Sequence, residues 1–160
     1  KTIRELKGEE VPKADVNPEI HLGLPAFIPE DYMPDEQGRL VAYKRLSMAD
    51  DADDLAEIKE ELMDRYGSLP TEVENLLEVI GIRNLMKVVK GKKMEYDGKH
   101  MAIHFHQNAP IEPEKILRLA RTTLKGLKLT PDFKLYVPMP DLQKKDVMAG
   151  ARGMLLELMH

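Results

Sequence analysis

Cysteine and tryptophan are absent from this sequence, and only 5% of its 160 residues are aromatic. The lack of cysteine excludes disulfide bonds, a thiol nucleophile and zinc bound by thiolates, and it agrees with the reducing cytoplasm. No apolar run approaches the roughly 20 residues of a membrane-spanning helix. The charged N-terminus KTIRELKGEE has no apolar signal core. We therefore expect a cytoplasmic protein that makes no membrane contact.

Motifs of nucleotide binding and nucleophilic catalysis are also missing. There is no GxxxxGK[ST] phosphate loop, no GxGxxG loop and no GxSxG turn. Ser47 and Ser68 are better explained as residues at helix ends than as nucleophiles. We predict no catalytic residue and no bound cofactor in this chain, so it is not an enzyme by itself.

Three histidines, His100, His104 and His106, fall on one face of a predicted strand. They could form a metal site with a carboxylate. Alternate residues of a strand, however, stand nearly 7 Å apart, and the sequence marks no third ligand. We favour a solvated strand face and predict no metal site.

The overall composition, 42% hydrophobic and 32% charged residues, is typical of a globular protein, and the length allows one folded domain with an extension. Ten methionines indicate an adaptable core. The net charge of −4 argues against a dedicated nucleic-acid binder, although a local basic patch stays open. The chain does not begin with Met, and we expect it to be part of a longer protein.

Residues 1–34 are interpreted as a linker and extended arm, and residues 35–160 as the C-terminal domain. The arm contains Pro25, Pro29 and Pro34, which a central strand would not tolerate. Alternation of Ile20, Leu22 and Leu24 with polar residues predicts a short strand. Whether this stretch is an arm lying on another surface or an edge strand of the domain's own sheet stays open.

A helix is predicted from Asp35, with its buried side supplied by Leu40, Val41, Tyr43 and Leu46. The segment from residue 57 to residue 87 predicts two further helices joined at a corner of Gly67 and Pro70. Asp50 or Asp51 would cap the first of them, and both apolar stripes would face one core. Thr71 and Glu74 match the capping box of the second.

Beyond residue 91 the hydrophobic period changes from helical to two. The pair Asp97 and Gly98 predicts a hairpin turn in which both residues can adopt positive φ. A helix from Pro113 that Gly126 closes, a third strand within residues 127–138 and a last helix follow. This order predicts an α+β fold, with the helical hairpin and further helices packed on a small, mostly antiparallel sheet.

Eight carboxylates lie between residues 50 and 64, with Lys59 as the internal counter-charge. The helix dipole accounts for those of the first turn. It does not account for Glu57, Glu60, Glu61 and Asp64. Such a face is either simply solvated or a docking surface for a basic patch on another domain or protein.

Basic residues gather where the second long helix ends, at Arg83, Lys87, Lys90, Lys92 and Lys93. Cations there complement the helix dipole, which is a sufficient structural reason. The alternative function is contact with DNA or RNA polymerase through this patch. Apart from Tyr96, aromatic residues that could stack on bases are absent from it.

The segments IPEDYMPD, YKR and DRYGSLP occur in this order. They resemble the C-terminal domain of the bacterial transcription-repair coupling factors (Mfd), over about residues 16–140. Tyr66 stands where phenylalanine is usual in that family. The resemblance extends to residues 1–16, which are similar to the end of the family's translocase module.

The resemblance implies a fragment of an ATP-dependent double-stranded DNA translocase that removes stalled RNA polymerase and recruits UvrA in nucleotide excision repair. ATP and Mg²⁺ would bind upstream domains. In the family, this C-terminal domain packs on an N-terminal module similar to UvrB and masks its UvrA-binding surface. The acidic contact residues match Glu61 and Asp64 here, with Glu57 and Glu60 as secondary candidates.

Overall fold

The computed structural model describes residues 17–159. The elements in chain order are β1 (Glu19–His21), α1 (Glu36–Met48), α2 (Ala52–Tyr66), α3 (Thr71–Val88), β2 (Gly91–Tyr96), β3 (His100–Phe105), α4 (Pro113–Arg121), β4 (Lys128–Leu129), β5 (Lys134–Pro138) and α5 (Lys144–Met159). The strands form one sheet in the order β1-β2-β3-β5-β4, in which β1 and β2 are parallel and the other pairs antiparallel. This arrangement confirms the predicted α+β class.

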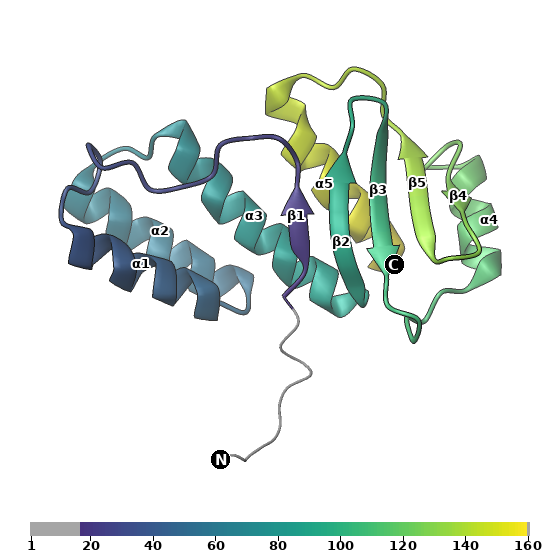
Figure 1. Ribbon diagram of the computed structural model, residues 1–160, viewed down its shortest axis with the longest axis horizontal. Helices are drawn as coiled ribbons and strands as arrows, with labels where there is room; N and C mark the ends of the chain where they lie inside the picture. The colour runs from purple at the N-terminus through teal and green to yellow at the C-terminus, as the bar shows by residue number, and fades with distance from the viewer. Residues whose placement is uncertain (1–16, 160) are drawn as a thin grey trace, which may run out of the picture.

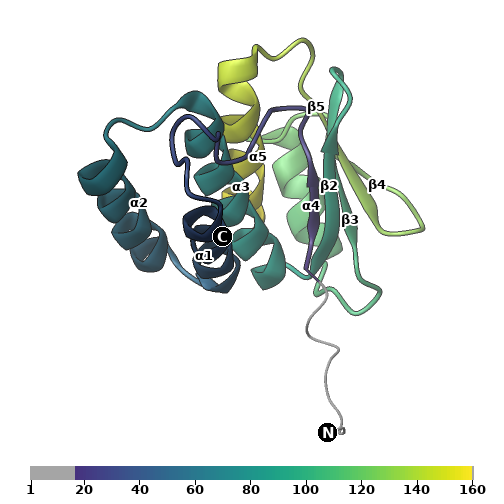
Figure 2. The ribbon, with the colours of Figure 1, turned by 60° about the vertical axis from the view of Figure 1, so that its left-hand side comes forward.

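Helices cover one face of the sheet. Helices α3, α4 and α5 lie on the same side of it, and α1 and α2 flank α3 on the side away from the strands (Figures 1 and 2). The open face carries the alternate residues of each strand, such as Glu95, His104 and Tyr136. Along β3, Met101, Ile103 and Phe105 point the other way and are buried, as the strand period predicts.

Two hydrophobic clusters hold the fold together, and α3 contributes to both. The first, here called the sheet core, lies between the sheet and the helices and includes Ile82 and Met86 of α3. The second, the helical core, lies among α1, α2 and α3 and includes Val73 and Ile80. The apolar stripe of α2 and the first part of that of α3 face the helical core together, as predicted, whereas Leu85 further along α3 packs against the sheet core. Helix α3 is the element that ties this hairpin to the sheet.

The arm, residues 22–34, lies across the helices instead of leaving the domain. Its apolar side chains are divided between the two cores, with Leu22 in the sheet core and Ile28 and Met33 in the helical core. The main-chain N–H of Ile28 donates to the Tyr43 hydroxyl at 2.7 Å. The preceding strand, β1, pairs with β2 at the edge of the sheet, which is the second of the two alternatives. Residues 1–16 lie outside the described residues.

Three of the four capping features predicted for α1, α2 and α3 are confirmed. Asp35 caps α1, Asp51 caps α2, and Gly67 ends α2 with a φ of 89°. The capping box of α3 is wrong. Thr71 is already the first helical residue, so the position before the helix belongs to Pro70, which has no side-chain oxygen to accept a bond.

The hairpin turn between β2 and β3 is confirmed, but its geometry differs from the expectation. Only Gly98 adopts a positive φ, of 93°. The carboxylate of Asp97 instead accepts hydrogen bonds from the main-chain N–H groups of Lys99 and His100, at 2.8 and 2.7 Å. These bonds lower the pKa of Asp97 and fold the turn through its side chain.

Three of the four residues predicted to form the buried side of α1 are exposed, and one of them is Tyr43, at 37%. Leu40 and Val41 are 57% and 59% exposed, whereas Ala42 and Leu46 are buried. The reason is the arm, because α1 turns Arg39 and Tyr43 toward it. The Arg39 guanidinium donates to the main-chain oxygen of Met33 at 2.8 Å.

Two later boundaries also differ. Helix α4 ends at Arg121, short of Gly126, because the main-chain N–H groups of Thr122 and Leu124 both bond to the Leu119 carbonyl. The segment expected as a third strand forms two short strands, β4 and β5. The turn between them contains Phe133, whose φ is 61°.

Candidate protein-interaction site

The acidic residues of α2 form one stripe along the side of the helix that faces solvent. Asp53, Glu57, Glu60 and Asp64 are spaced at i, i+4, i+7 and i+11, which places them above one another on a helix. All four are exposed. Ile58 and Leu62 of the opposite side are buried in the helical core. We call these four carboxylates the acidic stripe.

Glu61 lies beside the acidic stripe and is turned toward α1. The Arg45 guanidinium donates two hydrogen bonds to its carboxylate, at 3.0 and 2.8 Å. These bonds lower the pKa of Glu61. The basic partner of Glu61 thus comes from the neighbouring helix α1 and not from α2 itself. Arg45 holds the Glu61 carboxylate in one orientation at the surface.

Tyr32 of the arm fixes the C-terminal end of α2, next to Asp64. Its hydroxyl lies 3.1 Å from the main-chain oxygen of Leu62, in the last turn of α2, and 3.0 Å from that of Gly67, the residue that ends the helix. The centroid of its ring lies 5.7 Å from the centroid of the Tyr66 ring. Burial raises the pKa of Tyr32. The motifs IPEDYMPD and DRYG thus meet in space, a contact that sequence reasoning did not foresee.

The five basic residues singled out in the sequence do not form one patch. Arg83 is only 7% exposed. Its Nη2 donates to the main-chain oxygen of Ala49 at 3.1 Å and to Asn84 Oδ1 at 3.2 Å. Lys93 lies on the open face of the sheet, 3.8 Å from Glu95. Lys87, Lys90 and Lys92 remain exposed around the end of α3.

Comparison with known proteins identifies a family that this chain matches. A family model described as the TRCF domain matches residues 22–116, which is more than half of the chain. The chain belongs to the TRCF domain family. The matched stretch begins in the arm and ends in α4, so it contains the acidic stripe, Arg45 and the contact between Tyr32 and Tyr66.

Relatives of this TRCF domain are named transcription-repair-coupling factors. That of Myxococcus xanthus is 31% identical over 159 residues, 99% of this chain and 13% of the relative. That of Haemophilus influenzae is 35% identical over 129 residues, 81% of this chain and 11% of the relative. The chain therefore spans about an eighth of the length of such relatives.

A solved structure has the same fold. The crystal structure of a C-terminal domain of transcription-repair coupling factor superposes with a TM-score of 0.80 at 22% identity, covering 92% of this chain and 94% of that one. The TRCF domain is not a recognised catalytic domain. Within residues 17–159, none of the helices combines the length and apolar character needed to cross a membrane.

Arg83 has a structural role in this TRCF domain that can be tested. Burial lowers its pKa, and its Nε atom has no hydrogen-bond partner among the described residues. Arg83→Ala should destabilise the domain by about 2 kcal/mol, since it removes a charged hydrogen bond to the turn before α2 and leaves a void. Arg83→Met should cost about 1 kcal/mol or less, because it keeps the apolar stem and removes the unpartnered donor.

Urea unfolding followed by circular dichroism measures both variants of Arg83. Lys87→Ala, an exposed change one helical turn further on, serves as the control and should leave the midpoint within about 0.5 kcal/mol. Equal losses for the alanine and methionine variants would show that the hydrogen bonds, not the packing, account for the role of Arg83.

Two of the three predicted strand histidines, His100 and His104, have side-chain neighbours on the open sheet face. His104 Nε2 lies 2.6 Å from Glu95 Oε2, and this hydrogen bond lowers the pKa of Glu95. The His100 ring stands edge-on to Tyr136, with centroids 6.2 Å apart. Among residues 17–159, no three histidine or carboxylate side chains converge as a metal site would require. The absence of a resident metal stays a prediction.

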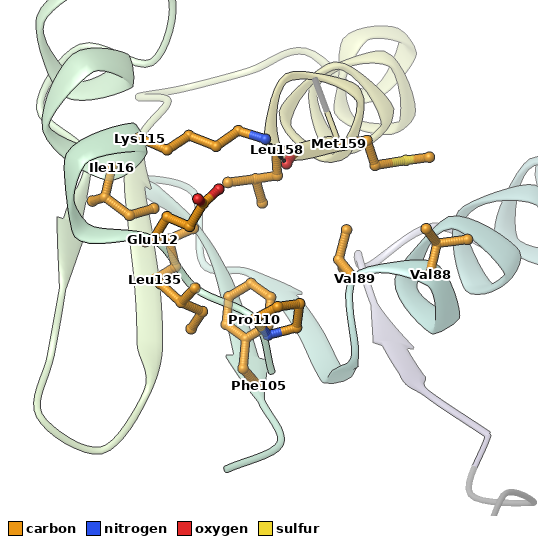
Figure 3. A pocket seen from close by; sticks show the side chains of 11 residues that line it. Val88, Val89, Phe105, Pro110, Glu112, Lys115, Ile116, Leu135, Leu158 and Met159 are labelled. Atoms are coloured by element: carbon orange, nitrogen blue, oxygen red, sulfur yellow. Dashed lines mark hydrogen bonds between the residues drawn. The ribbon is translucent and has the colours of Figure 1, made fainter. Parts of the chain in front are cut away.

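A cavity of about 330 Å³ lies at the end of the sheet core, between α3, α4 and the last turn of α5 (Figure 3). Its walls are mainly apolar, including Phe105, Ile116 and Leu135. The Lys115 ammonium donates to the main-chain oxygen of Leu158 at 2.5 Å and is thereby engaged. Glu112 is the other ionisable group of the lining. Since no nucleophile and base face each other there, the cavity suggests no reaction.

Proposed function

We propose that this TRCF domain is the non-catalytic, regulatory C-terminal domain of a transcription-repair coupling factor that acts in transcription-coupled nucleotide excision repair. Two observations support this: the relatives carry that name, and the chain corresponds to about an eighth of their length. The whole protein would be an ATP-dependent translocase on double-stranded DNA that removes stalled RNA polymerase and recruits UvrA. ATP and Mg²⁺ would bind its upstream domains, which agrees with the missing phosphate loop.

The domain would act by autoinhibition, masking the UvrA-binding surface of a UvrB-like N-terminal module. The acidic stripe supports this role, because four exposed carboxylates lie along one helix that packing holds on its opposite side. A fixed row of like charges complements a basic patch without reorganising first. Asp64, Glu60 and Glu57 would make the contact. Glu61 would join it through the carboxylate edge that Arg45 leaves free.

Titration of this domain against the separate N-terminal module tests the proposal. The dissociation constant should rise steeply between about 50 and 300 mM salt, since exposed charge pairs are screened. Asp64→Asn should weaken binding about fivefold. Glu114→Gln is the matched control, because Glu114 is an exposed carboxylate on α4, at the far end of the molecule from α2 (Figure 1). Equal weakening by both variants, or none by either, would contradict a specific role for the acidic stripe.

Contact with DNA through basic residues is the alternative function. Lys87, Lys90 and Lys92 remain as candidate DNA contacts, since Arg83 is buried and Lys93 lies on the open sheet face. Fluorescence anisotropy with labelled duplex DNA across salt concentrations distinguishes the two functions. Tight binding with a steep salt dependence that Lys90→Ala reduces would favour the alternative.

A further inference from the structure

A second surface of the domain is a groove of about 680 Å³ between α2, α3 and α5. These three helices lie next to one another in Figure 2. The floor of the groove is apolar and is formed by Leu55, Leu69, Leu77, Leu85, Val88 and Leu156. On α2 the groove uses Leu55 and Lys59, which lie on a different side of that helix from the acidic stripe. The groove is therefore a separate surface.

Large apolar side chains remain in contact with solvent in this groove. Val88 is 61% exposed and Leu156 is 40% exposed. On α3, Leu77, Gly81, Leu85 and Val88 follow one another at intervals of three and four residues, so they line a single side of the helix. Clustered exposed apolar residues with a polar rim indicate an interaction site, unlike single ones.

Gly81 points to close approach by a helix. A Cβ atom at this position would have one neighbour within 4 Å, the Leu55 Cδ1 atom at 3.7 Å, so the core leaves room for a side chain. Glycine inside a helix lowers its stability, and here no internal packing requires it. What it provides is a bare stretch of backbone on the floor of the groove, where an incoming helix can lie close.

The charged residues at the rim of the groove indicate which kind of partner can bind there. The lining contains four carboxylates, Asp50, Asp51, Glu74 and Glu78, but two cations, Lys59 and Arg152. Arg152 is already paired with Glu78 at 3.0 Å. In a dimer formed through this groove, the acidic rim of one copy would face the acidic rim of the other, and repulsion between like charges disfavours that dimer. The surplus of carboxylates instead matches a basic partner.

We propose that this groove binds an amphipathic helix of another protein, with Leu- or Met-sized side chains on one face and Lys or Arg on its flanks. The side of α3 between Glu74 and Val88 is about 21 Å long at the rise of an α-helix, which corresponds to a ligand of about 14 residues. Anchors at i, i+4 and i+7 would enter between Leu77, Leu85 and Leu156, and the basic flanks would face Glu74. This inference does not depend on the proposed autoinhibition.

The test uses a fluorescently labelled 14-residue peptide with leucine on one helical face and lysine on the other. It should bind the 160-residue chain, and a peptide of the same pattern with glutamate in place of lysine should bind at least tenfold more weakly. Gly81→Leu fills the groove from its floor and should weaken binding of the lysine peptide at least tenfold. Gly153→Leu is the matched control on α5, since Gly153 is exposed and outside the lining, and should leave binding unchanged.

Each outcome decides the proposal. Equal binding by the Gly81 and Gly153 variants, or equal binding of the two peptides, would overturn it. Dimerisation in sedimentation experiments that Gly81→Leu abolishes would show that a second copy occupies the groove instead. If Gly81→Leu lowers the unfolding midpoint, Glu74→Lys is used in its place. This variant should weaken binding of the lysine peptide and strengthen binding of the glutamate peptide. Unchanged binding of both peptides would overturn the proposal.

Discussion

A chain shortened to residues 35–160 should lose most of the stability of the domain. The shortened chain lacks the edge strand β1 and three buried side chains, those of Leu22, Ile28 and Met33. Burial of each such side chain contributes about 1.5–3 kcal/mol, so their loss amounts to about 5–9 kcal/mol. A domain has about 5–15 kcal/mol of stability in total. We therefore expect a shortened chain that is largely unfolded at 25 °C.

Point variants of the full 160-residue chain separate the contributions to this loss. Met33→Ala should cost about 2–5 kcal/mol, because Met33 is 2% exposed in the helical core. Tyr32→Phe should cost about 1 kcal/mol, because it removes only the hydroxyl that serves the end of α2. Both are measured by urea unfolding followed by circular dichroism. If residues 35–160 unfold at the same urea concentration as the full chain, the arm is a linker and the boundary at residue 34 is correct.

Features that depend on a few neighbouring residues could be predicted from the sequence. Asp35 and Asp51 precede apolar periodic stretches, and a cap needs only the N–H groups two or three residues later. Gly98 follows Asp97 between two alternating segments, and a hairpin turn is equally local. The same holds for the acidic stripe, whose spacing along one helix could be read without knowledge of the fold.

Features that depend on the rotation of one helix against another could not be predicted. The hydrophobicity of Leu40 and Val41 indicated burial, yet the hydrogen bonds of Arg39 and Tyr43 to the arm turn both outward. The pairing of Arg45 with Glu61 joins residues that are 16 positions apart.

Arg83 shows the same limitation for the candidate nucleic-acid contact. It shares its sign of charge with Lys87 and Lys90, but its guanidinium bonds to the Ala49 carbonyl in the turn before α2, whereas both lysines are exposed. The number of basic residues in a sequence does not tell which way each side chain points from its helix. That orientation depends on which sides of α3 are buried, and α3 contributes to both cores.

Reversing two charges of the acidic stripe, with Glu60→Lys and Asp64→Lys together, should raise the affinity of the full-length protein for UvrA by about 100-fold. The proposed contact closes over the UvrA-binding surface, so the apparent affinity is reduced by the fraction of molecules that are open. Two close charge pairs turned into repulsions weaken the closed state by about 3 kcal/mol or more. The open fraction then rises until most molecules are open, which sets the upper limit of the gain.

Glu61 is a poorer choice for reversal, although the family resemblance points to it. A lysine there would face Arg45, whose guanidinium lies 2.8 Å from the present carboxylate, and would disturb the packing of α1 on α2 as well as any external contact. Glu60 and Asp64 make no ion pair within residues 17–159, so their reversal changes the outer surface alone. Isothermal titration of UvrA into the full-length variants measures the effect, with Glu114→Lys as the control. An unchanged affinity in the folded double variant, together with unchanged binding of the domain to the N-terminal module, would remove the acidic stripe from the inhibitory contact.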